Sequence, residues 1–147
     1  MHDVTTKIYD YLPDEALRLR EEVFLGEQGF TVERDDIDDI AYHVTFDLDG
    51  VVVGTCRVFY DNGWTVGRIA VKKGMRGKGL GKALLLEAEK IAREKGGENL
   101  KLHAQVRAVH FYEKCGYKSY GKVAYEEWCE HIWMKKDLKK LTKIMKK

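Results

Sequence analysis

A glycine-rich turn in the middle of the chain joins a predicted strand over residues 64–71 to a predicted helix that begins near Leu80. Glycines stand at three alternate positions of this turn: Gly77, Gly79 and Gly81. Because glycine has no Cβ, the backbone of such a turn can approach a ligand closely. The strand, the turn and the helix together predict an α/β architecture with a binding site at the turn.

The turn also gathers positive charge. Three cations lie in it or at the start of the helix: Arg76, Lys78 and Lys82. The unpaired amides of a helix N-terminus attract anions, because the positive end of the helix dipole lies there. This combination is typical of a cradle for a diphosphate. The alternative is a turn that joins a strand to a helix and binds nothing.

Two common phosphate-binding motifs do not fit this turn. A nucleoside triphosphatase loop would need glycine at position 76 and a hydroxyl at position 83, where the chain has Arg76 and Ala83. A dinucleotide fingerprint through Gly79 and Gly81 would need a small residue at position 84, which is Leu84. That fingerprint also expects a parallel sheet, which the predicted hairpins exclude.

Hydrophobic periodicity predicts the remaining elements. Seven strands are expected, over residues 5–9, 43–48, 51–60, 64–71, 100–106, 118–125 and 129–136. Three helices are expected, from Asp14 to about Phe24, from Leu80 to the Gly96-Gly97 pair, and from Arg107 to Cys115. Asp49-Gly50 predicts a hairpin turn, and the acidic segment over 33–39 predicts a loop or a short helical turn. The order of elements predicts a mixed α/β (α+β) sheet with a βαβ unit over residues 64–106.

Composition narrows the class of protein. With 147 residues and 17.0 kDa, the chain has the length of a single domain, expected to cover residues 1–147. No stretch approaches the roughly 20 apolar residues that span a bilayer. The formal net charge of +2 is too small to predict a nucleic acid or membrane partner. The three cysteines have neither CxxC spacing nor a histidine cluster, and no signal peptide is evident, so we expect no metal and a cytoplasmic location.

Two motifs resemble those of the GNAT acetyltransferase superfamily. The segment over 76–81, Arg-Gly-Lys-Gly-Leu-Gly, is similar to that family's Arg/Gln-x-x-Gly-x-Gly/Ala coenzyme A motif. The segment over 108–117, Ala-Val-His-Phe-Tyr-Glu-Lys-Cys-Gly-Tyr, is similar to its Ala-x-x-Phe-Tyr-x-Lys-x-Gly-Phe/Tyr signature. The resemblance implies the GNAT fold, a mixed, mostly antiparallel sheet of about seven strands flanked by helices and splayed between the strands that end near Val71 and Gln105.

The resemblance also implies an acetyl-CoA-dependent N-acetyltransferase. The backbone of Ile69 and Val71 would hold the pantetheine and the thioester carbonyl, where one amide aimed at the oxyanion contributes roughly 10²–10³ in rate. Tyr112 stands where the family places a general acid for the departing thiolate; the alternative is an aromatic residue that only packs on its helix. The implied coenzyme A contacts are Ile69, Ala70, Val71, Arg76, Gly77, Lys78, Gly79, Leu80, Gly81, Lys82, Gln105, Phe111, Tyr112 and Lys114.

The expected acceptor is a primary amine of a small molecule, and an alkyl amine loses a proton before it attacks. Histidine has the intrinsic pKa of such a base, which makes His43 a candidate base or acceptor contact. The other residues expected toward the acceptor are Glu27, Glu33, Asp36 and His131, with Glu126 among the candidates for the base. A solvated histidine and a solvated acidic loop are the alternatives.

The two ends of the chain leave further alternatives open. Residues 20–28 resemble a bacterial subgroup of poorly defined acceptor specificity, but Trp128-Cys129-Glu130-His131 stands in place of that subgroup's Gly-Ile-Pro-His-like turn. The lysine-rich tail over 135–147 carries Leu138, Leu141 and Met145 at helical spacing, as expected of a solvated end or of packing on the domain or on a second copy of the chain. The alternative is a basic helix that binds an acidic membrane or a nucleic acid. A non-catalytic acetyl-CoA-binding module and a protein-amine acetyltransferase are the alternative functions.

Overall fold

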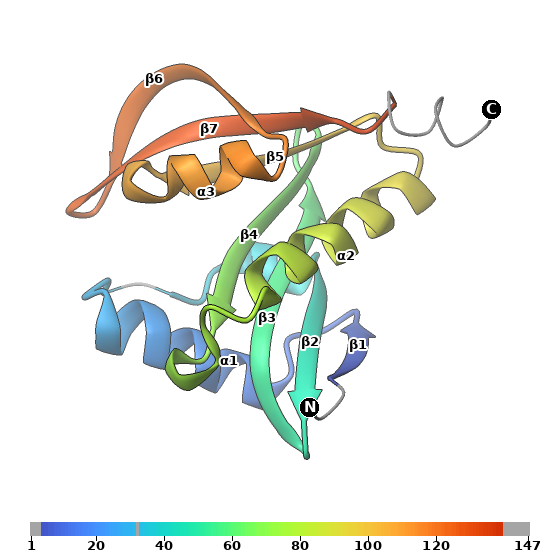
Figure 1. Cartoon of the computed structure of the whole chain (residues 1–147), viewed down its shortest axis with the longest axis vertical. Helices are drawn as coiled ribbons and strands as arrows, with labels where there is room; N and C mark the ends of the chain where they lie inside the picture. Colours follow the sequence, from blue (N-terminus) through green and yellow to red (C-terminus); the bar gives the residue numbers. More distant parts are fainter. Residues whose placement is uncertain (1–3, 32, 140–147) are drawn as a thin grey trace. The chain divides into compact units, whose positions relative to one another are not determined.

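A computed structural model describes residues 4–31 and 33–139. Within these residues, seven strands form one sheet in the order β1-β2-β3-β4-β5-β7-β6 (Figure 1). The strands are β1 (Thr5–Tyr9), β2 (Tyr42–Leu48), β3 (Val51–Tyr60), β4 (Trp64–Val71), β5 (Asn99–Gln105), β6 (Lys118–Glu126) and β7 (Cys129–Asp137). The helical elements are α1 (Asp14–Arg20), the π-helix η1 (Glu21–Glu27), the 3-10 turns η2 (Asp36–Asp39), η3 (Lys73–Met75) and η4 (Val106–Ala108), α2 (Leu80–Glu94) and α3 (Val109–Lys114).

The predicted mixed, mostly antiparallel sheet is confirmed. The pairs β1–β2, β2–β3, β5–β7 and β6–β7 are antiparallel, whereas β4 runs parallel to β5 at Thr65 and Lys101. The hairpin turn predicted at Asp49-Gly50 is confirmed as well, because both residues adopt the left-handed conformation, with φ of 51° and 81°.

The first helix extends further than the sequence predicts. It continues beyond Phe24 as the π-helix η1, in which the amide of Gln28 donates to the carbonyl of Val23 at 3.0 Å. A π-helix has a wider turn than an α-helix, so the spacing of apolar residues that detects α1 no longer applies in η1. The predicted helix over 107–115 also differs, since it begins as the 3-10 turn η4 before α3.

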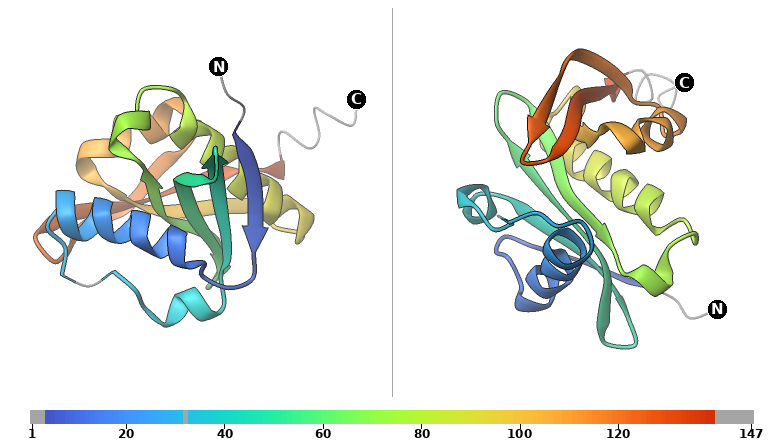
Figure 2. Two further views of the ribbon diagram at one scale, coloured as in Figure 1. Left: turned by 90° about the horizontal axis from the view of Figure 1, so that it is seen from below. Right: turned by 90° about the vertical axis from the view of Figure 1, so that its left-hand side faces the viewer.

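The described residues group into two compact units, which fall within residues 1–59 and 66–88 and within residues 60–65 and 89–147. In the first unit, helices cover both faces of β3 and the adjoining part of β4 (Figure 2). On one face, Leu19 and Val23 pack with Ala70 of β4. On the other face, Leu84 of α2 lies so close to Gly54 that a Cβ added there would be 3.5 Å from the leucine Cδ1. Burial of apolar side chains on both faces stabilises this unit, at roughly 1.5–3 kcal/mol for each large side chain.

The second unit contains β5, β6, β7, α3, the start of β4 and the end of α2 from Glu89 onward. β5 alternates between its faces: Leu100, Leu102 and Ala104 are buried, whereas Lys101, His103 and Gln105 are partly exposed. The residue after β7, Leu138, is buried, and its amide donates to the carbonyl of Glu98 at 2.8 Å. Leu138 therefore belongs to this core, while Leu141 and Met145 lie outside the described residues.

A buried carboxylate connects α2 with β7 in this unit. Glu89 is almost fully buried and accepts hydrogen bonds from the phenol of Tyr117 at 2.9 Å and from Nζ of Lys136 at 3.1 Å. Burial and the charge of Glu89 both raise the pKa of Tyr117, so the phenol keeps its proton and donates it to the carboxylate. Tyr117 is the last residue of the second motif, and here it has a structural role.

Candidate functional site

The glycine-rich turn leads from β4 into α2 through the short η3. Gly77 and Gly79 adopt φ of 78° and 83°, which side chains rarely adopt, and a Cβ added at either would meet no atom within 4 Å. Glycine is therefore needed here for its backbone conformation, and the space beside both residues is open. The carbonyl of Gly79 accepts from the amide of Ala83 at 3.1 Å and so begins the ladder of α2.

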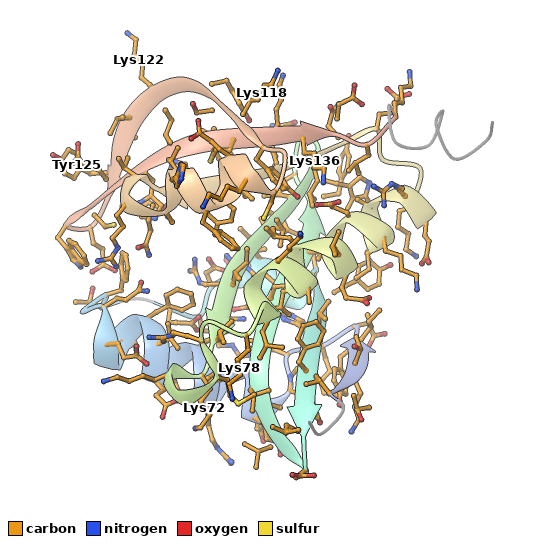
Figure 3. All side chains as sticks on the ribbon, viewed as in Figure 1. Lys72, Lys78, Lys118, Lys122, Tyr125 and Lys136 are labelled. Carbon is orange, nitrogen blue, oxygen red and sulfur yellow. The ribbon has the colours of Figure 1, made fainter. Side chains whose placement is uncertain are left out.

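The start of α2 combines free amides with cations. The first amides of a helix have no partner within the helix, and α2 is a 15-residue helix with a full dipole behind them. The side chains of Lys78 and Lys82 are exposed beside this end, and Figure 3 shows Lys72 and Lys78 on the connection between β4 and α2. The arrangement suits a diphosphate, since amides, dipole and cations are all available at one place.

Arg76 is held in a fixed position on the turn. Its Nε donates to the carbonyl of Val71 at 3.0 Å, and its Nη2 lies 2.7 Å from Oε1 of Glu27 in η1. Glu27, which the sequence predicts toward the acceptor, thus contacts a residue predicted to bind coenzyme A. Lys72 lies in a looser pair, 3.7 Å from Glu22.

The strand before the turn is bent at Arg68. This residue has φ of 48° in the middle of β4, a left-handed conformation that costs a non-glycine residue about 1–2 kcal/mol. Its guanidinium is held from outside the strand, because Nε donates to the carbonyl of Glu33 at 3.0 Å and Nη2 to Oδ2 of Asp35 at 3.3 Å. These contacts stabilise the bend immediately before Ile69, Ala70 and Val71.

The acidic segment predicted as a loop forms part of a charge network. Three arginines meet three carboxylates in the first unit: Arg20, Arg57 and Arg68 with Glu33, Asp35 and Asp38. Arg20 donates to Asp38 at 2.8 and 3.0 Å and to Glu33 at 3.0 Å, and all three residues are buried. The formal charges of this network cancel. Glu33 is therefore bound by arginine, while Asp36 is exposed.

Opposing effects act on the ionisation of Asp38. Burial alone would raise its pKa, but the hydrogen bonds and the charge of Arg20 outweigh burial, and the pKa is lowered. The pKa of Asp35 is lowered in the same way, with Arg57 as its main partner. Both carboxylates are thus ionised in the folded protein at neutral pH.

His43 lies inside this network and not at the surface. It is fully buried, and its Nε2 lies 2.9 Å from the carbonyl oxygen of Asp38, so this nitrogen carries the hydrogen. Its Nδ1 is buried with no hydrogen-bond partner among the described residues. Burial lowers the pKa of His43, which keeps the imidazole neutral.

The second unit contains the other predicted site residues. Phe111 and Tyr112 lie on α3 with ring centroids 5.1 Å apart in an edge-on arrangement, and Lys114 is exposed at the end of this helix. The carbonyl of Tyr112 accepts from the amides of Cys115 and Tyr117 at 3.0 and 3.1 Å, which fixes the helix end. Gln105 ends β5, and its Oε1 accepts from Nε of Arg107 at 2.8 Å.

His131 belongs to a cluster that the sequence does not reveal. Its Nε2 lies 3.2 Å from Oε2 of Glu126, and the same oxygen lies 2.6 Å from Nδ1 of His103. Sequence reasoning omits His103, although its place between the buried Leu102 and Ala104 already predicts that it lies on the polar face of β5. The pairing with Glu126 follows only from the strand order β5-β7-β6.

The described residues contain no group of histidine, cysteine or carboxylate side chains arranged to bind a metal ion. Likewise, none of their helices has both the length and the apolar character to cross a membrane. All three cysteines are free thiols.

Known proteins share both the sequence pattern and the fold. The acetyltransferase (GNAT) domain family matches residues 11–138. A Bacillus subtilis protein named as a candidate acetyltransferase is 34% identical over 127 residues, which are 82% of this chain and 86% of that protein. The uncharacterised N-acetyltransferase YjcF of Bacillus subtilis is 32% identical over 141 residues, 93% of this chain and all of YjcF. The crystal structure of an acyl-CoA N-acyltransferase from Pseudomonas aeruginosa superposes with a TM-score of 0.80 at 26% identity, over 92% of this chain and 99% of that one.

Proposed function

This chain belongs to the GNAT acetyltransferase family, and from that premise we propose that it transfers the acetyl group of acetyl-CoA to a primary amine of a small molecule. The observation that carries this proposal is the turn before α2. Its left-handed Gly77 and Gly79 leave open space beside the backbone, next to a helix N-terminus with exposed cations. A diphosphate-containing thioester such as acetyl-CoA fits this chemistry.

In the proposed reaction the turn binds the diphosphate of acetyl-CoA. Arg76, Lys78 and Lys82 add charge–charge attraction to the hydrogen bonds of the helix amides. We assign the backbone of Ile69 and Val71 to the pantetheine and the thioester carbonyl. The bend at Arg68 supports this role, because it interrupts the regular course of β4 immediately before these residues.

The chemical step is a direct attack of the neutral amine on the thioester carbon. The new C–N bond forms as the C–S bond breaks, and the sulfur leaves as a thiolate that needs a proton. We assign this proton to the phenol of Tyr112. A phenol has a pKa of about 10 and a thiol a pKa of about 8.5, so the transfer between them is only slightly unfavourable. We also place the reaction in the cytoplasm, where free thiols such as Cys56, Cys115 and Cys129 are stable.

Two alternatives use the same binding turn: an acetyl-CoA-binding protein without catalysis, and an enzyme that acetylates protein amines. The test is a thiol-release assay with acetyl-CoA and a panel of alkyl amines, amino sugars, aminoglycosides, amino acids and lysine peptides. Calorimetry with acetyl-CoA accompanies it. Binding with turnover of a small amine supports the proposal, binding without turnover supports the first alternative, and turnover of peptides alone supports the second.

A charge reversal at the turn tests the binding role. The double variant Arg76→Glu, Lys82→Glu should bind acetyl-CoA at least about 100-fold more weakly, because two attractive contacts with phosphate become repulsive. Lys90→Glu on the exposed side of α2 is the matched control. Equal affinity of the double variant and the wild type would remove the turn from the site and, with it, the basis of the proposal.

A further inference from the structure

A carboxylate in the second unit is held by two histidines. Oε2 of Glu126 lies 2.6 Å from Nδ1 of His103 and 3.2 Å from Nε2 of His131. The three residues come from β6, β5 and β7, where strand pairing sets His131 opposite Gln105 and Trp133 opposite His103. The cluster is thus built on the sheet and not on a loop.

The partners of His103 assign its hydrogen. A carboxylate oxygen accepts, so Nδ1 of His103 carries the hydrogen, and in the neutral ring Nε2 then has a lone pair. No hydrogen bond to this Nε2 occurs among the described residues. The ring stacks on Trp133, with centroids 4.7 Å apart and an angle of 25° between the planes, which fixes its orientation.

His131 has a different role in the cluster. Its Nδ1 lies 3.0 Å from the carbonyl oxygen of Cys129 and so carries a hydrogen, and its Nε2 lies 3.2 Å from Oε2 of Glu126, a contact that is favourable when this ring is protonated. Its side chain is 7% exposed, compared with 22% for His103. His103 is therefore the more accessible histidine of this pair.

We propose that His103 is the general base that takes a proton from the acceptor ammonium, with Glu126 as its positioning carboxylate. The inference rests on the proposed acetyl transfer. A carboxylate that accepts from Nδ1–H of a histidine fixes the tautomer and stabilises the imidazolium that forms, as in the serine protease triad. His103 also shares its face of β5 with Gln105, which the family resemblance places beside the cofactor.

The proton balance of the step is complete. An ammonium proton moves to Nε2 of His103, and the nitrogen lone pair that it leaves attacks the thioester carbon. The attacking nitrogen loses a second proton as the amide forms. Tyr112 gives one proton to the thiolate, and this second proton returns to Tyr112 through water. The net reaction releases one proton, which His103 passes to solvent before the next turnover.

Charged groups around His103 have opposite effects on its imidazolium. Glu126 on β6 favours the charged ring, whereas His131 on β7 disfavours it when it is itself protonated. The Nζ of Lys101 on β5 lies 5.0 Å from the centroid of the Trp133 ring, on which His103 stacks, and its positive charge also disfavours a positive charge on His103. Glu126 is the group in direct contact, so its removal should have the largest effect.

The test compares His103→Gln with His110→Gln in the full chain. His110 is the matched control, because it lies 3.9 Å from Glu113 but is 81% exposed. The acceptor is the alkyl amine of the panel with the highest turnover, and kcat/KM is measured from pH 6 to pH 10, together with acetyl-CoA affinity. At pH 7, His103→Gln should lose about 10²- to 10⁴-fold in rate with unchanged acetyl-CoA affinity, and His110→Gln should lose nothing.

The pH dependence separates a base from a structural residue. Without a base, the rate follows the fraction of neutral amine, so the deficit of His103→Gln should shrink about tenfold per pH unit below the amine's own pKa. A deficit that stays constant with pH, or wild-type rates in His103→Gln, would overturn the proposal while leaving acetyl transfer intact. Absence of acetyl-CoA binding by the wild type would overturn both proposals.

Glu126→Gln tests the positioning role with a readout other than activity. In imidazole nitrogen NMR spectra, the wild type should show His103 with hydrogen on Nδ1, and Glu126→Gln should shift the ring toward the tautomer with hydrogen on Nε2. The rate at pH 7 should fall in the same variant. An Nε2–H tautomer in the wild type would contradict the assignment, because the base would then have no lone pair on that nitrogen.

Discussion

Nη2 of Arg76 lies 2.7 Å from Oε1 of Glu27, so a carboxylate of η1 occupies a guanidinium that we assign to the diphosphate of acetyl-CoA. Glu27 and a phosphate would compete for this cation. Glu27→Gln should therefore raise the affinity for acetyl-CoA about two- to fivefold, as expected for a partly exposed pair. Calorimetry measures the change, with Glu21→Gln in the same helix as the control. Weaker binding by Glu27→Gln would mean that Glu27 positions Arg76 and does not compete for it.

Tyr112→Phe tests the proposed general acid. Loss of the phenol should lower kcat by about 10- to 10⁴-fold with little change in acetyl-CoA affinity, because the proton is needed only as the thiolate departs. Steady-state kinetics and calorimetry check the two quantities separately. Tyr125→Phe serves as control, since Tyr125 is 69% exposed on β6. An unchanged kcat in Tyr112→Phe would remove the phenol from the mechanism.

Acid should destabilise the first unit through Asp38. The folded-state pKa of this carboxyl is lowered, so its contribution to the free energy of unfolding is present above the unfolded pKa of about 3.9 and is lost as pH falls below that value. Carboxyl carbon NMR should find Asp38 still ionised at pH 3, which is about one unit below the usual pKa of an aspartate. An ordinary titration of Asp38 would show that Arg20 contributes little to this part of the structure.

Tyr117→Phe tests the buried contact with Glu89. Removal of the phenol leaves the carboxylate with one donor fewer in a buried site, which should lower the free energy of unfolding at pH 7 by about 1–3 kcal/mol. Because the pKa of Tyr117 is raised, its contribution is fully present below the unfolded pKa of about 10 and is lost as pH rises above it. Urea unfolding at pH 7 and pH 10.5 measures both effects, and Tyr125→Phe should change neither.

The sequence is most informative where local rules apply. Asp49-Gly50 predicts a hairpin because its turn favours residues that tolerate positive φ, and alternation predicts the strands within a residue or two. The positive φ of Arg68 escapes prediction, because arginine rarely adopts it and the contacts to Glu33 and Asp35 that stabilise it come from residues far away in the sequence.

The candidate site is predicted in part for the same reason. Its glycines and cations are close in sequence, so their common role follows from one short segment. Glu33 and His103 depend on partners elsewhere in the chain. The sequence predicts Glu33 to be part of a solvated acidic segment, but the structure shows that it binds Arg20. His103 contacts Glu126 only because of the order of the last three strands in the sheet. No local pattern contains that information.

The balanced charges of the network around Arg20 have a consequence for the choice of acceptors. Carboxylates that arginines already neutralise exert little long-range pull on a polycation, so strongly charged amines gain no advantage in encounter rate from this part of the protein. For the proposed transfer to amines, we therefore expect discrimination to depend on shape and on individual hydrogen bonds. A substrate search weighted toward polyamines would therefore depend on a long-range attraction that this network does not supply, and monoamines of varied size and polarity form the more informative library.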